Sequence, residues 1–180
     1  NSFCQEGSKF IGLVEPIDNK FGLRFAGGSM QMGTAASVGF ALSKKLKGEE
    51  GIVYCLESDG GVDGGIFWES LLIAAHHKLN NLVLIIDNNG FSAMGKKNDI
   101  LNVEPLKDKF ESFGWGVSEC NGHDYEQIEM LLSGEMSVPQ VIIAKTTKGK
   151  GVSFMENNNL YHYKNLSEEE YNLSLKELNE

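Results

Sequence analysis

The chain has 180 residues, 41% of them hydrophobic, which is enough for one domain with a buried core. Its formal net charge of −9 and its pI of about 5.0 argue against nucleic acid and anionic membranes as main partners. No apolar run approaches the ~20 residues of a membrane span. Three widely spaced cysteines predict a reducing, cytoplasmic location rather than a disulfide framework or a zinc site.

The front of the chain is rich in glycine. Residues 1–33 read mostly as loop, with a tight turn at Gly27-Gly28. The first residue is Asn1 rather than Met, so a processed chain and a chain that lacks its amino-terminal segment are both open. Without a linker or repeat in the sequence, we expect residues 1–180 to form a single domain.

Apolar stretches of helical and strand length alternate along the rest of the chain. In chain order they predict a helix at 34–46, a strand at 52–56, a helix at 66–78, a strand at 82–86, a helix at 106–113, a strand at 116–119, a helix from the Asp124 cap to Leu132, a strand at 141–144 and a final helix after Ser167. This alternation predicts an α/β fold, a doubly wound and mostly parallel sheet with helices on both faces.

Two polar residues follow neighbouring predicted strands. Asp59 comes after the first strand and Asn89 after the second, thirty residues later. Ligands of open parallel sheets bind at the carboxyl ends of strands, so both residues are expected on the binding edge. A carboxylate and an amide oxygen suit a hard cation that also holds a phosphate. Asp-Gly and Asn-Gly are ordinary turn signals when taken singly, but the pair at this spacing favours a ligand.

Glycines around this pair fit the same interpretation. Gly60 and Gly61 allow a close approach of the backbone to a ligand, and the helix beginning near Gly65 directs free N–H groups toward an anion. The residues alone therefore indicate a site for a metal-bound diphosphate.

The wider pattern resembles the transketolase family. The likeness is carried by Asp59-Gly60, Trp68-Glu69, His76-His77-Lys78-Leu79 and Asp87-Asn88-Asn89-Gly90, by Gly28-Ser29-Met30-Gln31-Met32-Gly33, by Gly122-His123-Asp124 and by Lys148-Gly149-Lys150-Gly151 with His162. It spans roughly residues 3 to 165.

The resemblance implies a diphosphate-binding domain for thiamine diphosphate and Mg²⁺ (or Ca²⁺). Asp59, Asn89 and the Phe91 carbonyl would hold the metal, and Gly60 and Gly61 would contact the diphosphate. Gly28, Met30 and Asn89 would complete the cofactor site, with Met30 against the pyrimidine. His162 would be the catalytic residue, near the reacting end of the substrate.

The same resemblance implies the amino-terminal subunit of a split transketolase, which transfers a two-carbon ketol unit between sugars or sugar phosphates. The family's pyrimidine-binding domain, which carries the activating glutamate, has no counterpart in this chain. We therefore expect the chain to be inactive alone and to need a carboxy-terminal partner in an α2β2 assembly.

Three positions depart from the family pattern. Ser58 replaces the first glycine of Gly-Asp-Gly, Gly64 replaces a glutamate of an interfacial relay, and Leu13 replaces a substrate-side histidine. These departures keep two alternatives open, a degenerate non-catalytic transketolase-like subunit and a transketolase that acts on an unusual sugar. A third alternative is the α-type subunit of another thiamine diphosphate enzyme, a class that shares the metal motif.

Overall fold

A four-stranded sheet forms the centre of the molecule. A computed structural model provides the structure, and it describes residues 6, 24, 25 and 29–179. The strand order is β1-β2-β6-β5, and every neighbouring pair is parallel. The strands are β1 (Val53–Ser58), β2 (Leu82–Asn88), β5 (Gly116–Asn121) and β6 (Gln140–Lys145). The short strands β3 (Phe91–Ser92) and β4 (Gly95–Lys96) form a separate antiparallel pair.

Helices precede, connect and follow the strands. They are α1 (Met32–Lys47), α2 (Gly65–His76), α3 (Lys97–Ile100), α4 (Leu106–Ser112), α5 (Tyr125–Leu132) and α6 (Glu168–Asn179), with the 3₁₀ turns η2 (Asp59–Asp63) and η3 (Asn159–His162). Every strand and helix expected from the sequence is present. The strands extend one or two residues beyond their predicted carboxyl ends, because the polar residues there still pair through their backbones.

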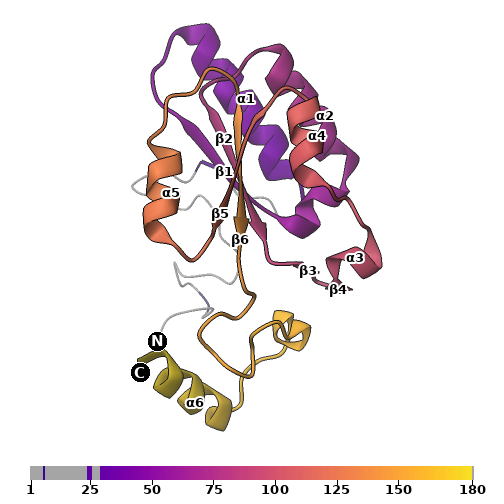
Figure 1. The fold of residues 1–180 in the computed structure, drawn as a ribbon, viewed down its shortest axis with the longest axis vertical. Helices are drawn as coiled ribbons and strands as arrows, with labels where there is room; N and C mark the ends of the chain where they lie inside the picture. The colour runs from indigo at the N-terminus through magenta and orange to yellow at the C-terminus, as the bar shows by residue number, and fades with distance from the viewer. Residues whose placement is uncertain (1–5, 7–23, 26–28, 180) are drawn as a thin grey trace.

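Helices cover both faces of the sheet, as the sequence predicts. Figure 1 shows α1, α2 and α4 on one side of the sheet and α5 on the other. The chain steps from β1 through β2 to β5 in one direction and then back to β6. Because crossovers between parallel strands are right-handed, a connection that runs in the reverse direction has its helix on the opposite face of the sheet. The helix α5, which connects β5 to β6, lies on that face.

Two apolar clusters hold these layers together. The larger joins α1, α2 and α4 to the sheet and contains Phe67, Leu71, Leu84, Phe110 and Ile143. The smaller joins α5 to the other face around Val83, Cys120 and Ile142. The strand β2 contributes to both clusters, which confirms that its apolar run is buried on both faces.

Capping residues set the ends of several helices. Gly48, at a φ of 67°, ends α1, and the Asp124 side chain accepts the Gln127 N–H at the start of α5. Ser167 and Glu170 form a reciprocal capping box at α6, in which each side chain accepts the other's backbone N–H. The helix starts predicted at Asp124 and Ser167 are therefore confirmed.

Beyond β6 the chain leaves the sheet at its carboxyl edge. Figure 1 shows η3 and α6 there, apart from the helical layers. Within the part of the chain that the structure describes, no helix has the length and apolar character to cross a bilayer.

Candidate functional site

Asp59 and Asn89 both lie at the carboxyl edge of the sheet, as their spacing predicts. Each is the first residue after its strand, and β1 and β2 lie side by side with Ser58 opposite Asp87. The Gly90 N–H donates a hydrogen bond of 2.6 Å to Oδ2 of Asp59. The two predicted ligand loops are therefore in direct contact.

The Asp59 carboxylate is buried, and only one of its two oxygens has a hydrogen-bond partner among the described residues. The residue is 1% exposed, and its second oxygen, Oδ1, has no hydrogen-bond partner among the described residues. Burial raises the pKa of Asp59, while the Gly90 N–H and the Lys97 ammonium oppose that rise. A buried, unpartnered carboxylate oxygen is costly, and a bound cation would satisfy it. Asp59 therefore fits a metal site.

Hydrogen bonds fix the orientation of the Asn89 amide. Its Nδ2 donates to Asp87 at 3.3 Å, and its Oδ1 accepts the Phe91 N–H at 2.9 Å. The Thr146 hydroxyl, at the end of β6, donates to the other oxygen of Asp87. A carbonyl oxygen has two lone pairs, so Oδ1 keeps one for a further partner. Asp87 and Thr146 are functional candidates that the sequence pattern does not reveal, because their contact depends on the pairing of β2 with β6.

The glycines after Asp59 lie under the side chains of other segments. A Cβ at Gly60 would come within 3.2 Å of the Met30 Cε, so the predicted cofactor residues Met30 and Gly60 are neighbours. A Cβ at Gly61 would overlap the Glu57 carboxylate, so a side chain there would have to displace it. Gly28, also predicted for this site, lies outside the described residues, as does Leu13.

Gln31 occupies the space beside Gly64. A Cβ at position 64 would lie 2.5 Å from the Gln31 Cδ, so the amide stands where a side chain at 64 would begin. Gln31 adopts a left-handed φ of 68° at the N-cap of α1, which is strained for a residue with a Cβ. A side chain at position 64 would therefore push the Gln31 amide aside.

The neighbouring departure, Ser58, has a local use. Its Oγ accepts the Gly61 N–H at 3.1 Å and caps η2, the turn that carries Asp59. Ser58 thus supports the turn in which the predicted metal ligand stands.

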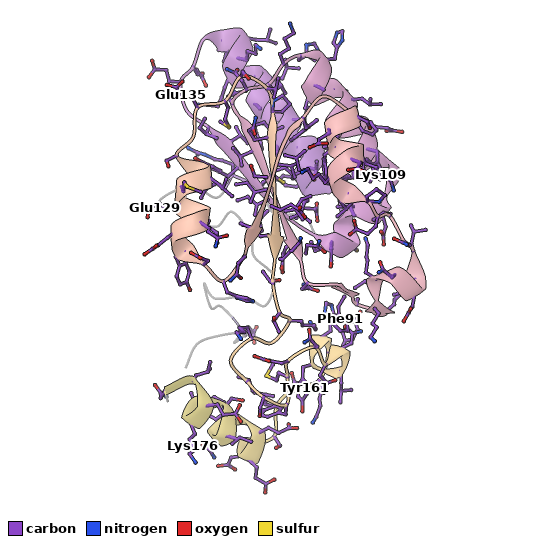
Figure 2. All side chains as sticks on the ribbon, viewed as in Figure 1. Phe91, Lys109, Glu129, Glu135, Tyr161 and Lys176 are labelled. Atoms are coloured by element: carbon purple, nitrogen blue, oxygen red, sulfur yellow. The ribbon has the colours of Figure 1, made fainter. Side chains whose placement is uncertain are left out.

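His162 lies on a different segment from these residues. It is exposed at the end of η3, and its ring packs on Tyr163 at 4.7 Å between centroids. Its segment does lie on the same side as the site, because Asn159 donates to the Ala93 carbonyl beside β3 at 3.2 Å. Figure 2 shows Phe91 and Tyr161 at this end of the molecule. The catalytic role of His162 stays a prediction.

A hollow also lies along the carboxyl edge of the sheet, on the opposite side of β2 from β1 and Asp59. This shallow hollow of about 370 Å³ is lined by Glu119, Cys120, Asn121, Gln127 and Lys145, at the ends of β5 and β6. Among the described residues no three His, Cys, Asp or Glu side chains cluster as a metal site. The Asp59–Asn89 pair instead suits a hard cation that takes its other ligands from a bound anion and water.

A comparison with known protein families matches residues 1–178 to the domain described as "Transketolase, thiamine diphosphate binding domain". This chain is a member of the transketolase family. The resemblance drawn from its motifs is thereby confirmed, and thiamine diphosphate is the cofactor that the family domain binds.

Several relatives of this transketolase-family chain are named as subunits of transketolases. It is 37% identical over 180 residues to one subunit of the apulose-4-phosphate transketolase of Actinobacillus succinogenes, covering 98% of this chain and 64% of the relative. It is 32% identical over 160 residues to the SqwG subunit of the 6-deoxy-6-sulfo-D-fructose transketolase of a Clostridium species, covering 87% of this chain and 58% of the relative. The chain thus spans about three fifths of the length of these curated relatives.

A solved transketolase has the same fold. The crystal structure of transketolase from Campylobacter jejuni superposes with a TM-score of 0.89 at 34% identity, covering 99% of this chain and 29% of that one. The predicted fold class, a parallel sheet between helices of the thiamine diphosphate-binding type, is confirmed.

Proposed function

We propose that this chain is the diphosphate-binding subunit of a split transketolase, which transfers a two-carbon ketol unit between sugars or sugar phosphates. The single observation that carries the proposal is the buried Asp59 carboxylate, with one oxygen unpartnered among the described residues and the other 2.6 Å from the loop of Asn89. A carboxylate in this state destabilises a chain that never binds a cation, so its presence supports a metal site.

In this proposal Asp59, Asn89 and the Phe91 carbonyl hold Mg²⁺ or Ca²⁺. Gly60 and Gly61 contact the diphosphate, and Gly28 and Met30 lie at the pyrimidine. When bound, thiamine diphosphate supplies the electron sink that stabilises the two-carbon fragment.

The chain's own residues position this site. The Gly90 N–H orients the Asp59 carboxylate, and the Asp87 carboxylate orients the Asn89 amide. Uncapped N–H groups at the start of α2, where Gly64 provides no side-chain cap, favour an anion at the same edge. We assign His162 to the substrate side of the cofactor, in a single domain of residues 1–180.

A partner subunit with the pyrimidine-binding domain completes the proposed enzyme, in an α2β2 assembly. Support comes from the relatives that are named as subunits of transketolases. A cytoplasmic location belongs to the same proposal, supported by the free, buried thiols of Cys55 and Cys120.

The test is a two-carbon transfer assay with thiamine diphosphate and Mg²⁺. The purified chain alone should be inactive, and the chain mixed with a pyrimidine-binding partner, such as one encoded by a neighbouring gene, should turn over. Asp59→Ala is the control and should stay inactive with the partner present. Robust turnover by the chain alone would contradict the split-enzyme proposal, and cofactor binding that Asp59→Ala leaves intact would contradict the metal site.

A further inference from the structure

Lys97 is a buried lysine beside η2, the turn that carries Asp59. The proposed function leaves this lysine without a role. It is 6% exposed, whereas the adjacent Lys96 is exposed. Its Nζ donates to the Asp59 backbone carbonyl and to Oδ1 of Asp63, the latter at 2.5 Å. Lysine is almost never fully buried unless it is paired, so the location of this ammonium calls for a specific reason.

The contacts of Lys97 close a ring that joins both ligand loops. The Lys97 backbone N–H donates to the Gly90 carbonyl at 2.9 Å. The Gly90 N–H in turn donates to the Asp59 carboxylate, and the Lys97 ammonium returns to the Asp59 carbonyl. Asp59 is thus fixed at its side chain by the Asn89 loop and at its backbone by Lys97.

Lys97 stands at the junction of three elements. It is the first residue of α3, directly after the β3–β4 pair that begins at Phe91, and its side chain reaches back to η2. Figure 2 shows Phe91 at the edge of the sheet from which this junction extends. All three proposed metal ligands, Asp59, Asn89 and Phe91, therefore belong to segments that Lys97 connects.

We propose that Lys97 is a positioning residue for the metal site, which holds the Asp59 turn and the Asn89 loop in register before any ligand arrives. The inference rests on the proposed function, since it assigns Lys97 to the metal site proposed there. Asp63 is the counter-ion that allows the ammonium to remain in this buried place.

A purely structural ion pair is the competing explanation, and it makes a different prediction. A buried ion pair can often be replaced by apolar residues of similar volume without loss of stability. The double variant Lys97→Met/Asp63→Leu should then fold stably. If Lys97 acts as a positioning residue, the Asp59 turn and the Asn89 loop should still lose their order in this stable variant.

The first measurement needs no ligand. Hydrogen exchange of the Gly90 amide reports the bond to Asp59, and it should be at least ten-fold faster in Lys97→Met and in the double variant than in the wild-type chain. Amides of β2 such as Leu84 should keep their protection, and the control Lys96→Met should match the wild type. Unchanged exchange at Gly90 in a folded Lys97 variant would overturn the inference.

The second measurement is a titration with Mg²⁺ and thiamine diphosphate, followed by tryptophan fluorescence. The Trp68 indole donates to the Val62 carbonyl of η2 at 2.9 Å, so its fluorescence reports on the turn that carries Asp59. The stable double variant should bind at least ten-fold more weakly than wild type and Lys96→Met. Equal affinity would overturn the inference while the proposed function stands. A wild-type protein that binds neither alone nor with its partner subunit would contradict the proposed metal site, and Gly90 exchange would still decide the role of Lys97.

Discussion

Two regions beyond the carboxyl ends of the strands place their carboxylates in opposite surroundings, one buried and partly unpartnered, the other near water and fully hydrogen-bonded. The metal edge (Asp59, Asn89, Gly90 and Lys97) buries a carboxylate with one oxygen unpartnered among the described residues. The terminal segment (residues 159–179) keeps the charges of Lys164 and Glu170 near water and pairs them with each other. There, Glu170 accepts from Lys164 at 2.5 Å and from the Tyr161 hydroxyl at 2.8 Å.

The difference separates residues placed for binding from residues placed for stability. Glu170 accepts from Lys164, Tyr161 and Ser167 on its own segment, and its pKa is lowered to about 2, chiefly by the Lys164 hydrogen bond. The pKa of Asp59 is raised because burial disfavours its charge. A carboxylate that opposes folding is expected where a ligand, not the fold, is its intended partner.

The largest expected effect is at Asp59. Asp59→Asn should abolish the binding of Mg²⁺ and thiamine diphosphate, by more than roughly a hundred-fold, because the charged ligand is lost. It should also stabilise the metal-free chain by about 1 kcal/mol at neutral pH, since a neutral amide is cheaper to bury unpartnered. Calorimetric titration measures the first effect and denaturant unfolding the second.

The sign of the stability effect follows from the direction of the pKa shift. A folded pKa above the unfolded value favours the folded state at low pH, and that contribution is lost as pH rises through the folded pKa of Asp59. The gain from Asp59→Asn should therefore appear on going from acidic to neutral pH. A variant that is less stable than wild type at neutral pH would show that the ionised Asp59 is already satisfied by the fold.

Removing the Thr146 hydroxyl should affect the same edge less strongly. Thr146→Val keeps the side-chain shape but removes the donor to Asp87, the residue that orients Asn89. We expect weaker binding of Mg²⁺ and thiamine diphosphate by about 1 kcal/mol, roughly five-fold. Thr147→Val, next in the chain, is the control. Equal affinities for the two variants would show that Asp87 and Thr146 do not support the metal site.

Gly64 and Gln31 offer a test of the packing beside η2, the turn that carries Asp59. Gly64→Ala should destabilise the chain only slightly, by about 0.5 kcal/mol, because its Cβ would push aside the Gln31 amide at the flexible end of that side chain. Gly65→Ala, with open space around its Cβ, should have no such cost. In a Gln31→Gly background the cost of Gly64→Ala should vanish. Denaturant unfolding of these variants measures the coupling, and additive effects would show that the two positions are independent.

The smallest expected effect lies in the terminal segment. Because the pKa of Glu170 is lowered from 4.5 to about 2, its contribution to the docking of α6 is present above pH 4.5 and is lost as pH falls toward 2. Glu170→Gln should therefore loosen α6 at neutral pH and remove this acid dependence, with cofactor binding unchanged. Hydrogen exchange of α6 amides measures the effect, with the exposed Glu169→Gln as control. A global loss of stability would show that the terminal segment is part of the core.

The sequence predicts the sheet and the placement of Asp59 and Asn89 at one edge, because both follow from where the apolar runs end. Apolar runs define strands, and parallel pairing brings the residues after neighbouring strands to one edge. Strand ends are less visible, because Ser58, Asp87 and Asn88 look like loop residues yet pair through their backbones. The two-residue strands β3 and β4 are too short to produce a pattern.

Long-range contacts account for the rest of what the sequence does not reveal. Lys97 looks like a solvent-exposed lysine, and only the fold brings it to Asp59, 38 positions away. Gln31 beside Gly64 likewise depends on how α1 meets α2. The position of His162 depends on an irregular path after β6, and it ends exposed on η3.

The most direct test of the metal site is a calorimetric titration with thiamine diphosphate in the presence of Mg²⁺, comparing wild type with Asp59→Asn. The assembled two-subunit protein is the matched second sample. We predict saturable, Mg²⁺-dependent binding that Asp59→Asn abolishes in the chain or in its assembly. Binding that is indifferent to Asp59, or no binding in either sample, would contradict the proposed role of the Asp59 carboxylate.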